Sequence, residues 1–188
     1  MLESVATRWH HTTTAHAATA HAAIAHEEPL MDQIIIDLQT FVAGLNPLLS
    51  ILAITFLGGV PFVESYLGTM IGAVAGIALP LALGAALLGN TVAILVAGGA
   101  GGVVANRRTN TPAAAHSRRA RVVARTDKYG VPIASLLAPT VFAISLTTFI
   151  MVSVGYRPRR VITWQIIAAV AWGLGVAAAY LGMQTLTG

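Results

Sequence analysis

Long runs without charge dominate the pattern of apolar and polar positions along this chain. Residues 38–106 carry one charged side chain, that of Glu64, and residues 129–156 and 161–188 carry none. A helix crosses the hydrocarbon core of a bilayer with about 20 apolar residues, so each run is long enough for at least one crossing. The pattern therefore predicts an all-α, polytopic membrane protein.

Prolines and glycines interrupt these runs in the same order twice. Each half contains a proline, then a glycine, then a second proline, and then a long apolar helix. The positions are Pro61, Gly76, Pro80 and residues 81–104 in the first half, and Pro139, Gly155, Pro158 and residues 161–184 in the second. Proline interrupts a helix because it lacks an amide donor and clashes with the preceding turn. We expect two hairpins, over about residues 48–79 and 129–156, the second turning near residues 138–140.

The basic residues predict how these segments are oriented. Residues 107–128 hold seven basic residues and one acid, and a second cluster, Arg157, Arg159 and Arg160, precedes the last apolar run. Basic clusters in short connections stay on the cytoplasmic side of a membrane. The second hairpin would then enter from the cytoplasm and the first from outside. The sequence predicts two inverted repeats, each a Pro-broken re-entrant hairpin plus a spanning helix; a plain bundle of four or five spanning helices is the alternative.

The chain divides into five regions by composition. They are a low-complexity His/Ala tail (1–31) predicted to be disordered, an interfacial amphipathic helix (32–46), the first membrane repeat (47–106), a basic cytoplasmic segment (107–128) and the second membrane repeat (129–188). The tail histidines recur every five residues and so do not share a helix face, which argues against a metal site. Met31 is a candidate start residue.

The basic segment contains a predicted short helix over residues 118–129. Its basic side chains form one stripe at helical spacing, consisting of Arg118, Arg121, Arg125 and Lys128. Such a stripe lies well on an anionic membrane surface. It serves either as a topology anchor or, with Arg157, Arg159 and Arg160, as a site for lipid phosphates. The sequence pI of about 10.1 thus reflects topology and does not indicate nucleic-acid binding.

Glu64 is the first candidate for function, because a charge at bilayer depth is costly and usually serves a purpose. In one interpretation Glu64 binds a proton in competition with a cationic substrate. In the other, it only caps the helix that starts after Pro61, where an acid complements the helix dipole. The residues predicted to line a shared site with Glu64 are Pro61, Ser65, Tyr66, Asn90, Pro139 and Thr140.

The sequence offers no pattern of an enzyme. Cysteine is absent, which removes thiolate nucleophiles and Cys-based metal sites. No HExxH motif occurs, and the glycines at positions 98, 99, 101 and 102 lack the strand and lysine of a phosphate-binding loop. We therefore expect no catalysis, no metal and no cofactor.

Several runs resemble one family of membrane proteins. They are the Gly59–Gly68 run with its Pro-Phe-Val-Glu-Ser core, Leu88–Thr91, Asp127–Pro132, Ala138–Pro139 and Trp172–Gly173. These are similar to the actinobacterial small multidrug export (efflux) proteins, a family distantly similar to the DedA/VTT group. The resemblance implies paired re-entrant hairpins and, as in some DedA members, movement of lipids across the bilayer. DedA proteins typically carry arginines near the second hairpin's proline, and this chain has none beside Pro139.

Together these features predict a secondary transporter of the bacterial plasma membrane. It would export a drug-like cation or translocate a lipid, and Glu64 would couple this transport to a proton. Its expected partners are membrane lipids, and it could act as a homo-oligomer or as part of a larger membrane complex. The alternative is a non-transporting structural or accessory subunit of a membrane complex. The sequence does not choose between the two substrate classes.

Overall fold

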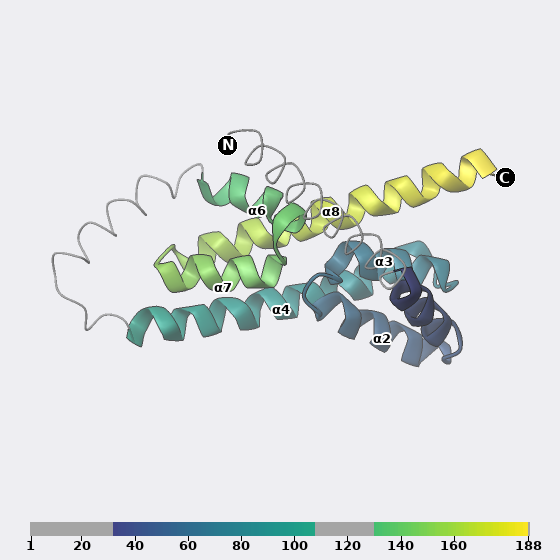
Figure 1. Cartoon of the computed structure of the whole chain (residues 1–188), viewed down its shortest axis with the longest axis horizontal. Coiled ribbons are helices and arrows are strands. Elements are labelled where there is room, and N and C mark those ends of the chain that lie inside the picture. The colour runs from purple at the N-terminus through teal and green to yellow at the C-terminus, as the bar shows by residue number, and fades with distance from the viewer. Residues whose placement is uncertain (1–31, 108–129, 188) are drawn as a thin grey trace, which may run out of the picture. The chain divides into compact units, whose positions relative to one another are not determined.

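The structure is a computed structural model that describes residues 32–107 and 130–187 (Figure 1). The predicted His/Ala tail and the predicted basic helix with Arg118, Arg121, Arg125 and Lys128 lie outside the described residues. The chain divides after Phe41 into two units, which we describe separately. All regular structure in the described ranges is helical, which confirms the all-α prediction for these residues.

The described part of the first unit is helical from residue 32 onward, and this helix runs to residue 43 in the second unit. Gln33 Nε2 donates a hydrogen bond of 2.9 Å to Asp37 Oδ1 one turn later. The apolar side chains of Ile34 and Phe41 are 53% and 61% exposed. Placement of this helix at a membrane interface stays a prediction.

The second unit contains the same order of helices twice, short, short and long. The elements are α2 (Pro47–Gly59), α3 (Glu64–Val74) and α4 (Leu79–Arg107), followed by α6 (Gly130–Val141), α7 (Ile144–Val154) and α8 (Pro158–Thr187). At a rise of 1.5 Å per residue, α4 and α8 are about 45 Å long and the short helices about 16 to 20 Å. Gly76 and Gly155 follow α3 and α7 with φ of +90° and +106°, a left-handed conformation that glycine adopts without strain.

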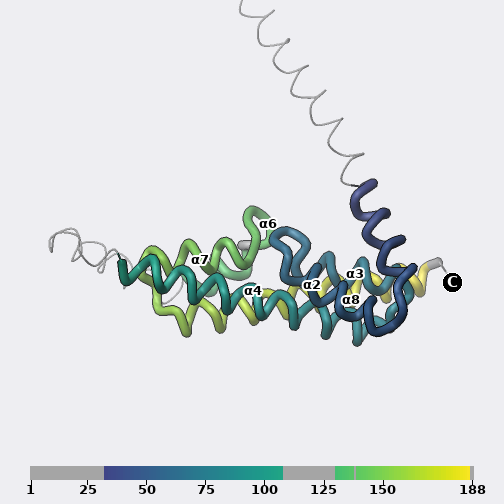
Figure 2. Tube along the Cα trace, turned by 90° about the horizontal axis from the view of Figure 1, so that it is seen from below, coloured from purple at the N-terminus to yellow at the C-terminus, as the bar shows by residue number. Residues whose placement is uncertain are grey.

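The two hairpins of short helices pack at opposite ends of α4, as Figures 1 and 2 show. Gly58 of α2 and Gly68 of α3 both face Ala86, in the first half of α4. Gly101, in the last part of α4, faces Phe149 of α7. The tips of both hairpins lie near the middle of α4, where Gly59 faces Gly89 and Ile144 packs with Ile94.

Helices α2 and α4 cross with their backbones in contact. A Cβ atom added at Gly89 would lie 1.7 Å from the carbonyl oxygen of Thr55, and one added at Gly58 would lie 2.2 Å from that of Ala86. Only glycine permits this approach. Gly68 and Gly72, one turn apart on α3, contact Ala86 and Ala82 of α4.

Within the described residues, α4 and α8 are the helices long and apolar enough to cross a membrane. Most of the apolar side chains of α4 and α8 are not buried within the described structure and face outward. Large side chains such as Leu88, Val96 and Leu174 are 52% to 66% exposed. An apolar surface of this kind is typical of a protein surrounded by lipid.

The turn of the second hairpin differs from the prediction. It lies at residues 142–143, and Pro139 is inside α6. Proline costs a helix one backbone hydrogen bond, and α6 continues only as far as Val141 beyond it. The helix tolerates Pro139 because the proline is near its C-terminal end, where few intrahelical bonds depend on it.

Candidate functional site

The tip of the first hairpin has an unusual backbone. Phe62 and Glu64 have φ of +71° and +50°, a region that residues with a side chain seldom occupy. Backbone bonds hold the turn, including one of 3.1 Å from the Glu64 N–H to the Val60 carbonyl. Strained residues of this kind cluster at functional positions, where the surrounding structure maintains them. The backbone of the turn thus sets the direction of the Glu64 side chain.

The Glu64 carboxylate reaches the N-terminus of a helix in the other half of the chain. Its Oε1 accepts a hydrogen bond from the backbone N–H of Ile144, the first residue of α7 and 80 positions away. Ala143, at the N-cap position of α7, has no side chain that can accept this bond. The negative carboxylate also complements the positive end of the α7 dipole. Glu64 therefore joins the tips of the two hairpins.

This contact extends the capping interpretation of Glu64, which is an acid in the first turn of its own helix, α3. At the start of its own helix, α3, the N-cap residue Val63 makes no side-chain capping bond. Glu64 instead supplies the cap that α7 lacks. Glu64 thus lies in the first turn of α3, as the capping interpretation expects, and also caps α7, a contact between distant hairpins that local sequence rules do not reveal.

Ser65 links three helices next to Glu64. Its hydroxyl donates a bond of 2.8 Å to the Ala169 carbonyl of α8 and accepts one of 3.3 Å from Asn90 Nδ2 of α4. Glu64, Ser65 and Asn90 are each at most 1% exposed. We call this set of five residues the tip junction; its members are Glu64, Ser65, Asn90, Ile144 and Ala169.

The tip junction lies in apolar surroundings. Ile144 and Ala169 pack with Ile94, one turn beyond Asn90 on α4, in a buried apolar cluster. Among the described residues, Glu64 Oε2 and Asn90 Oδ1 have no hydrogen-bond partner. Buried acceptors of this kind usually have a partner, because burying a bare polar atom is costly.

The other predicted site residues are not members of the tip junction. Tyr66 follows Ser65 in α3; its hydroxyl donates to the Phe62 carbonyl at 2.9 Å, and its ring lies 6.4 Å from that of Trp172. Pro61 is exposed in the turn. Thr140 is exposed and donates to the Leu137 carbonyl of its own helix. The structure thus brings Glu64, Ser65 and Asn90 together and leaves Thr140 outside the tip junction.

The sequence did not point to the partners that complete the tip junction. Two of them are backbone groups, the Ile144 N–H and the Ala169 carbonyl, which any residue type provides. Trp172 also matters, because its Nε1 donates a bond of 2.9 Å to the Leu136 carbonyl and so connects α8 to α6. Trp172 is 36% exposed, and its position in the sequence carries no signal of this contact.

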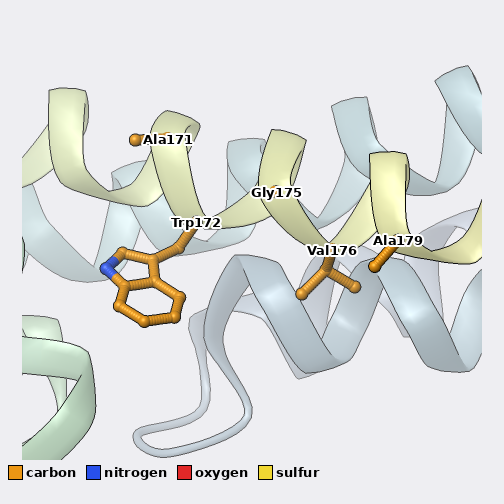
Figure 3. Close-up of a pocket in the computed structure, with 5 residues that line it drawn as sticks. All are labelled: Ala171, Trp172, Gly175, Val176 and Ala179. Atoms are coloured by element: carbon orange, nitrogen blue, oxygen red, sulfur yellow. The ribbon is translucent and has the colours of Figure 1, made fainter.

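A shallow pocket of about 380 Å³ lies along one face of α8 (Figure 3). Its lining residues are all small or apolar: Ala171, Trp172, Gly175, Val176 and Ala179. Trp172, shown at one end of the pocket in Figure 3, is also the residue that contacts Tyr66. Glu64 is not among the lining residues, so this pocket offers an apolar surface beside the tip junction and no charged group.

The described basic residues gather at one end of the second unit. Arg107 ends α4, Arg157 directly precedes α8, and Arg159 and Arg160 lie in its first turn. Because α4 and α8 run in opposite directions, these ends lie together (Figure 1). Arg157 and Arg159 are exposed.

Comparison of the chain with protein-family models, with curated proteins and with solved structures found no match. The resemblance to the small multidrug export and DedA/VTT proteins therefore stays a prediction.

We expect Ser65→Ala to destabilise the protein by about 1 to 3 kcal/mol, because it leaves the Ala169 carbonyl and Asn90 Nδ2 without their buried partner. Thr140→Ala removes an exposed hydroxyl that bonds within its own helix and is the matched control, with a change below about 0.5 kcal/mol. Thermal unfolding of the purified protein in detergent measures both. Equal midpoints for the two variants would contradict a structural role for the Ser65 bonds.

Proposed function

We propose that this chain is a multi-pass membrane protein that acts as a secondary transporter, and that Glu64 is the group that couples its two hairpins. One observation carries the proposal, the bond from the Glu64 carboxylate to the N–H of Ile144 at the start of α7. In transporters with broken helices, half-helix ends of this kind surround the site for substrate and coupling ion. In this proposal, α2 with α3 and α6 with α7 form two re-entrant hairpins of inverted orientation.

The dimensions of the helices support this arrangement. The hydrocarbon core is about 30 Å thick, which α4 and α8 exceed and which a helix of 11 to 13 residues crosses only about halfway. Packing of the hairpins at opposite ends of α4 favours entry from opposite faces of the bilayer. The basic end, with Arg107 and Arg157, would face the cytoplasm by the positive-inside rule.

Glu64 is suited to coupling because it is the single charged side chain in residues 42–106 and 130–156. Its bond to α7 holds the hairpin tips together in the state that the structure describes. Proton binding to the carboxylate, or approach of a substrate charge, would weaken this bond. The tips could then separate and expose the site to one side of the membrane, as alternating access requires.

Two substrate classes suit the surroundings of the tip junction. The rings of Tyr66 and Trp172 lie together near Glu64, and aromatic faces attract organic cations. The apolar pocket along α8 opens outward and would hold the hydrocarbon part of a lipid or of an amphipathic drug. The proposal therefore covers efflux of a drug-like cation and translocation of a lipid.

Reconstitution in liposomes tests the proposal. Wild-type protein is expected to drive proton-coupled efflux of a cationic dye or flipping of a labelled polyprenyl phosphate. Glu64→Gln keeps the size of the side chain and an acceptor for the Ile144 N–H but removes the charge, and it should abolish the coupled activity while the protein stays folded. If Glu64→Gln kept the wild-type rate in whichever of the two assays the wild-type protein is active, Glu64 would be ruled out as the coupling group.

A second function, a structural or accessory subunit of a membrane complex, is favoured by a different observation. Glu64 is only 1% exposed and acts as the cap of α7, as a purely structural residue would. In this case folded wild-type protein would show neither activity in liposomes. Glu64→Gln would then lower the thermal stability of the protein without any transport defect.

A further inference from the structure

The second hairpin and the first half of α8 bury polar atoms that have no hydrogen-bond partner among the described residues. These atoms are Ser135 Oγ in α6, Thr147 Oγ1 in α7 and Gln165 Oε1 in α8. Ser135 and Gln165 are each 0% exposed. Burying a bare polar atom is costly, so atoms of this kind usually bond to protein or to ordered water. We call Ser135, Thr147 and Gln165 the polar layer.

Helices α7 and α8 bring Thr147 and Gln165 close to the same level. The helices α6, α7 and α8 pack against one another (Figures 1 and 2). Gln165 Nε2 lies 4.0 Å from Met151 Sδ of α7. Thr147 lies one turn from Met151 on the same face of α7, on the side of the tip junction. Sulfur is a weak acceptor, so the contact with Met151 leaves the Gln165 amide with unused hydrogen-bonding capacity.

Ser135 contributes to this level from α6. Val131, one turn earlier on the same face of α6, packs with Val152 of α7 and Val161 of α8 in a buried apolar cluster. Ser135 therefore lies one turn closer to the tip junction than these valines. Pro139, a further turn along α6, has no N–H, so the Ser135 carbonyl lacks its usual α-helical donor.

We propose that the polar layer binds internal water, enclosed between the apolar cluster of Val131, Val152 and Val161 and the tip junction. The hydroxyl and amide groups of the layer include both donors and acceptors, and a buried water molecule needs about two to four such partners. Helices α6 and α7 contain no charged residue, so a ligand at this level is expected to be neutral. Water is small and neutral, and it both donates and accepts hydrogen bonds.

The position of this water suggests a use within the proposed transporter. The layer lies between the tip junction and the basic end of the second unit, where Arg159 and Arg160 begin α8. Water at this level would give Glu64 a hydrated neighbour on the side of the basic end, with the three valines as an apolar barrier beyond it. This use rests on the proposed function, whereas the water site itself does not.

X-ray radiolytic footprinting of the full wild-type chain in detergent tests the proposal. X-rays convert bound water into hydroxyl radicals, which oxidise the side chains beside it, and methionine becomes the sulfoxide. Met151 lies against Gln165 and is less exposed than Met70 of α3, which is 37% exposed. Water outside the protein would therefore oxidise Met70 first, whereas internal water should oxidise Met151 faster. Oxidation of Met151 no faster than that of Met70 would overturn the proposal, and this wild-type result needs no variant.

Two variants assign the labelling to the polar layer. Ser135→Ala and Gln165→Leu each remove a partner of the water, so each should slow the oxidation of Met151 and lower the unfolding temperature by about 2 to 4 °C. The double variant should lose less than the sum, because both side chains share the same water. Thr163→Ala removes an exposed hydroxyl that bonds within α8 and is the matched control, with neither change. A wild-type rate of Met151 oxidation in the folded double variant would contradict the assignment.

Transport data separate this inference from the proposed function. Fast oxidation of Met151 in a protein that moves neither dye nor lipid would refute the transporter and keep the water site. Transport by a protein in which Met151 is protected from oxidation would refute the water site and keep the transporter.

Discussion

Gly89→Ala is expected to prevent the first hairpin from packing and to leave little folded protein. The added Cβ atom would lie 1.7 Å from the carbonyl oxygen of Thr55 and 3.0 Å from the backbone nitrogen of Gly59. Both are backbone atoms of α2, so the clash is relieved only if α2 moves away from α4. Overpacking typically costs about 1 to 3 kcal/mol, and a clash with backbone belongs at or above the upper end of that range.

Gly84→Ala is the matched control for this prediction. Gly84 lies in the same helix, α4, and an added Cβ atom there meets no other atom within 4 Å. Alanine is preferred over glycine inside a helix by about 1 kcal/mol, so Gly84→Ala should be as stable as the wild type or slightly more stable. Unfolding midpoints and the yield of monodisperse protein in detergent measure both variants. A Gly89→Ala protein as stable as Gly84→Ala would show that α2 and α4 are not in backbone contact.

The order of elements could be predicted from the sequence because it depends on local features. Proline and glycine mark helix ends through their own backbone restrictions, so the long helices expected over residues 81–104 and 161–184 correspond to α4 and α8. The second turn lies at residues 142–143 and not at the predicted 138–140, because Pro139 is a helix residue near the end of α6. Only packing decides whether a helix continues past such a proline.

Local sequence features predict the packing role of some glycines and not of others. Gly68, Gly72 and Gly76 recur every four residues, a spacing typical of helix packing faces, and the first two do pack against α4. Gly76 has a different role, since its φ of +90° ends α3. The closest backbone approach is at Gly89, which carries no pattern of its own. Its importance comes from Thr55, a residue of another helix.

In the candidate site, too, the sequence predicts some features and leaves others open. Glu64 could be identified because a lone acid in a long apolar run is rare, and Ser65 and Asn90 were sound candidates because polar side chains in such runs seek partners. The role of Glu64 at α7 could not be predicted. It depends on a bond between residues 80 positions apart, and the donor is a backbone N–H that leaves no mark in the sequence.

The second prediction concerns where the tip of the first hairpin lies in the membrane. The proposal places Phe62 at mid-depth, although its side chain is 59% exposed on the protein surface. Leu48 at the start of α2 and Ala78 just before α4 would both lie at the outer face. If α2 and α3 instead crossed the membrane as two full spans, Phe62 would lie at the cytoplasmic face. The two arrangements therefore predict different locations for Phe62, the membrane interior in the first and the cytoplasmic face in the second.

Cysteine labelling in intact cells distinguishes the two arrangements, because the chain has no cysteine of its own and single substitutions are read without background. The variants are Leu48→Cys, Phe62→Cys, Ala78→Cys and Arg157→Cys, treated with a membrane-impermeant maleimide before and after the cytoplasmic side is opened. We expect Leu48→Cys and Ala78→Cys to react from outside, Arg157→Cys only from the cytoplasm, and Phe62→Cys from neither side. Reaction of Phe62→Cys from the cytoplasm would contradict the re-entrant hairpin, and with it the meeting of two inverted hairpins at Glu64 inside the membrane.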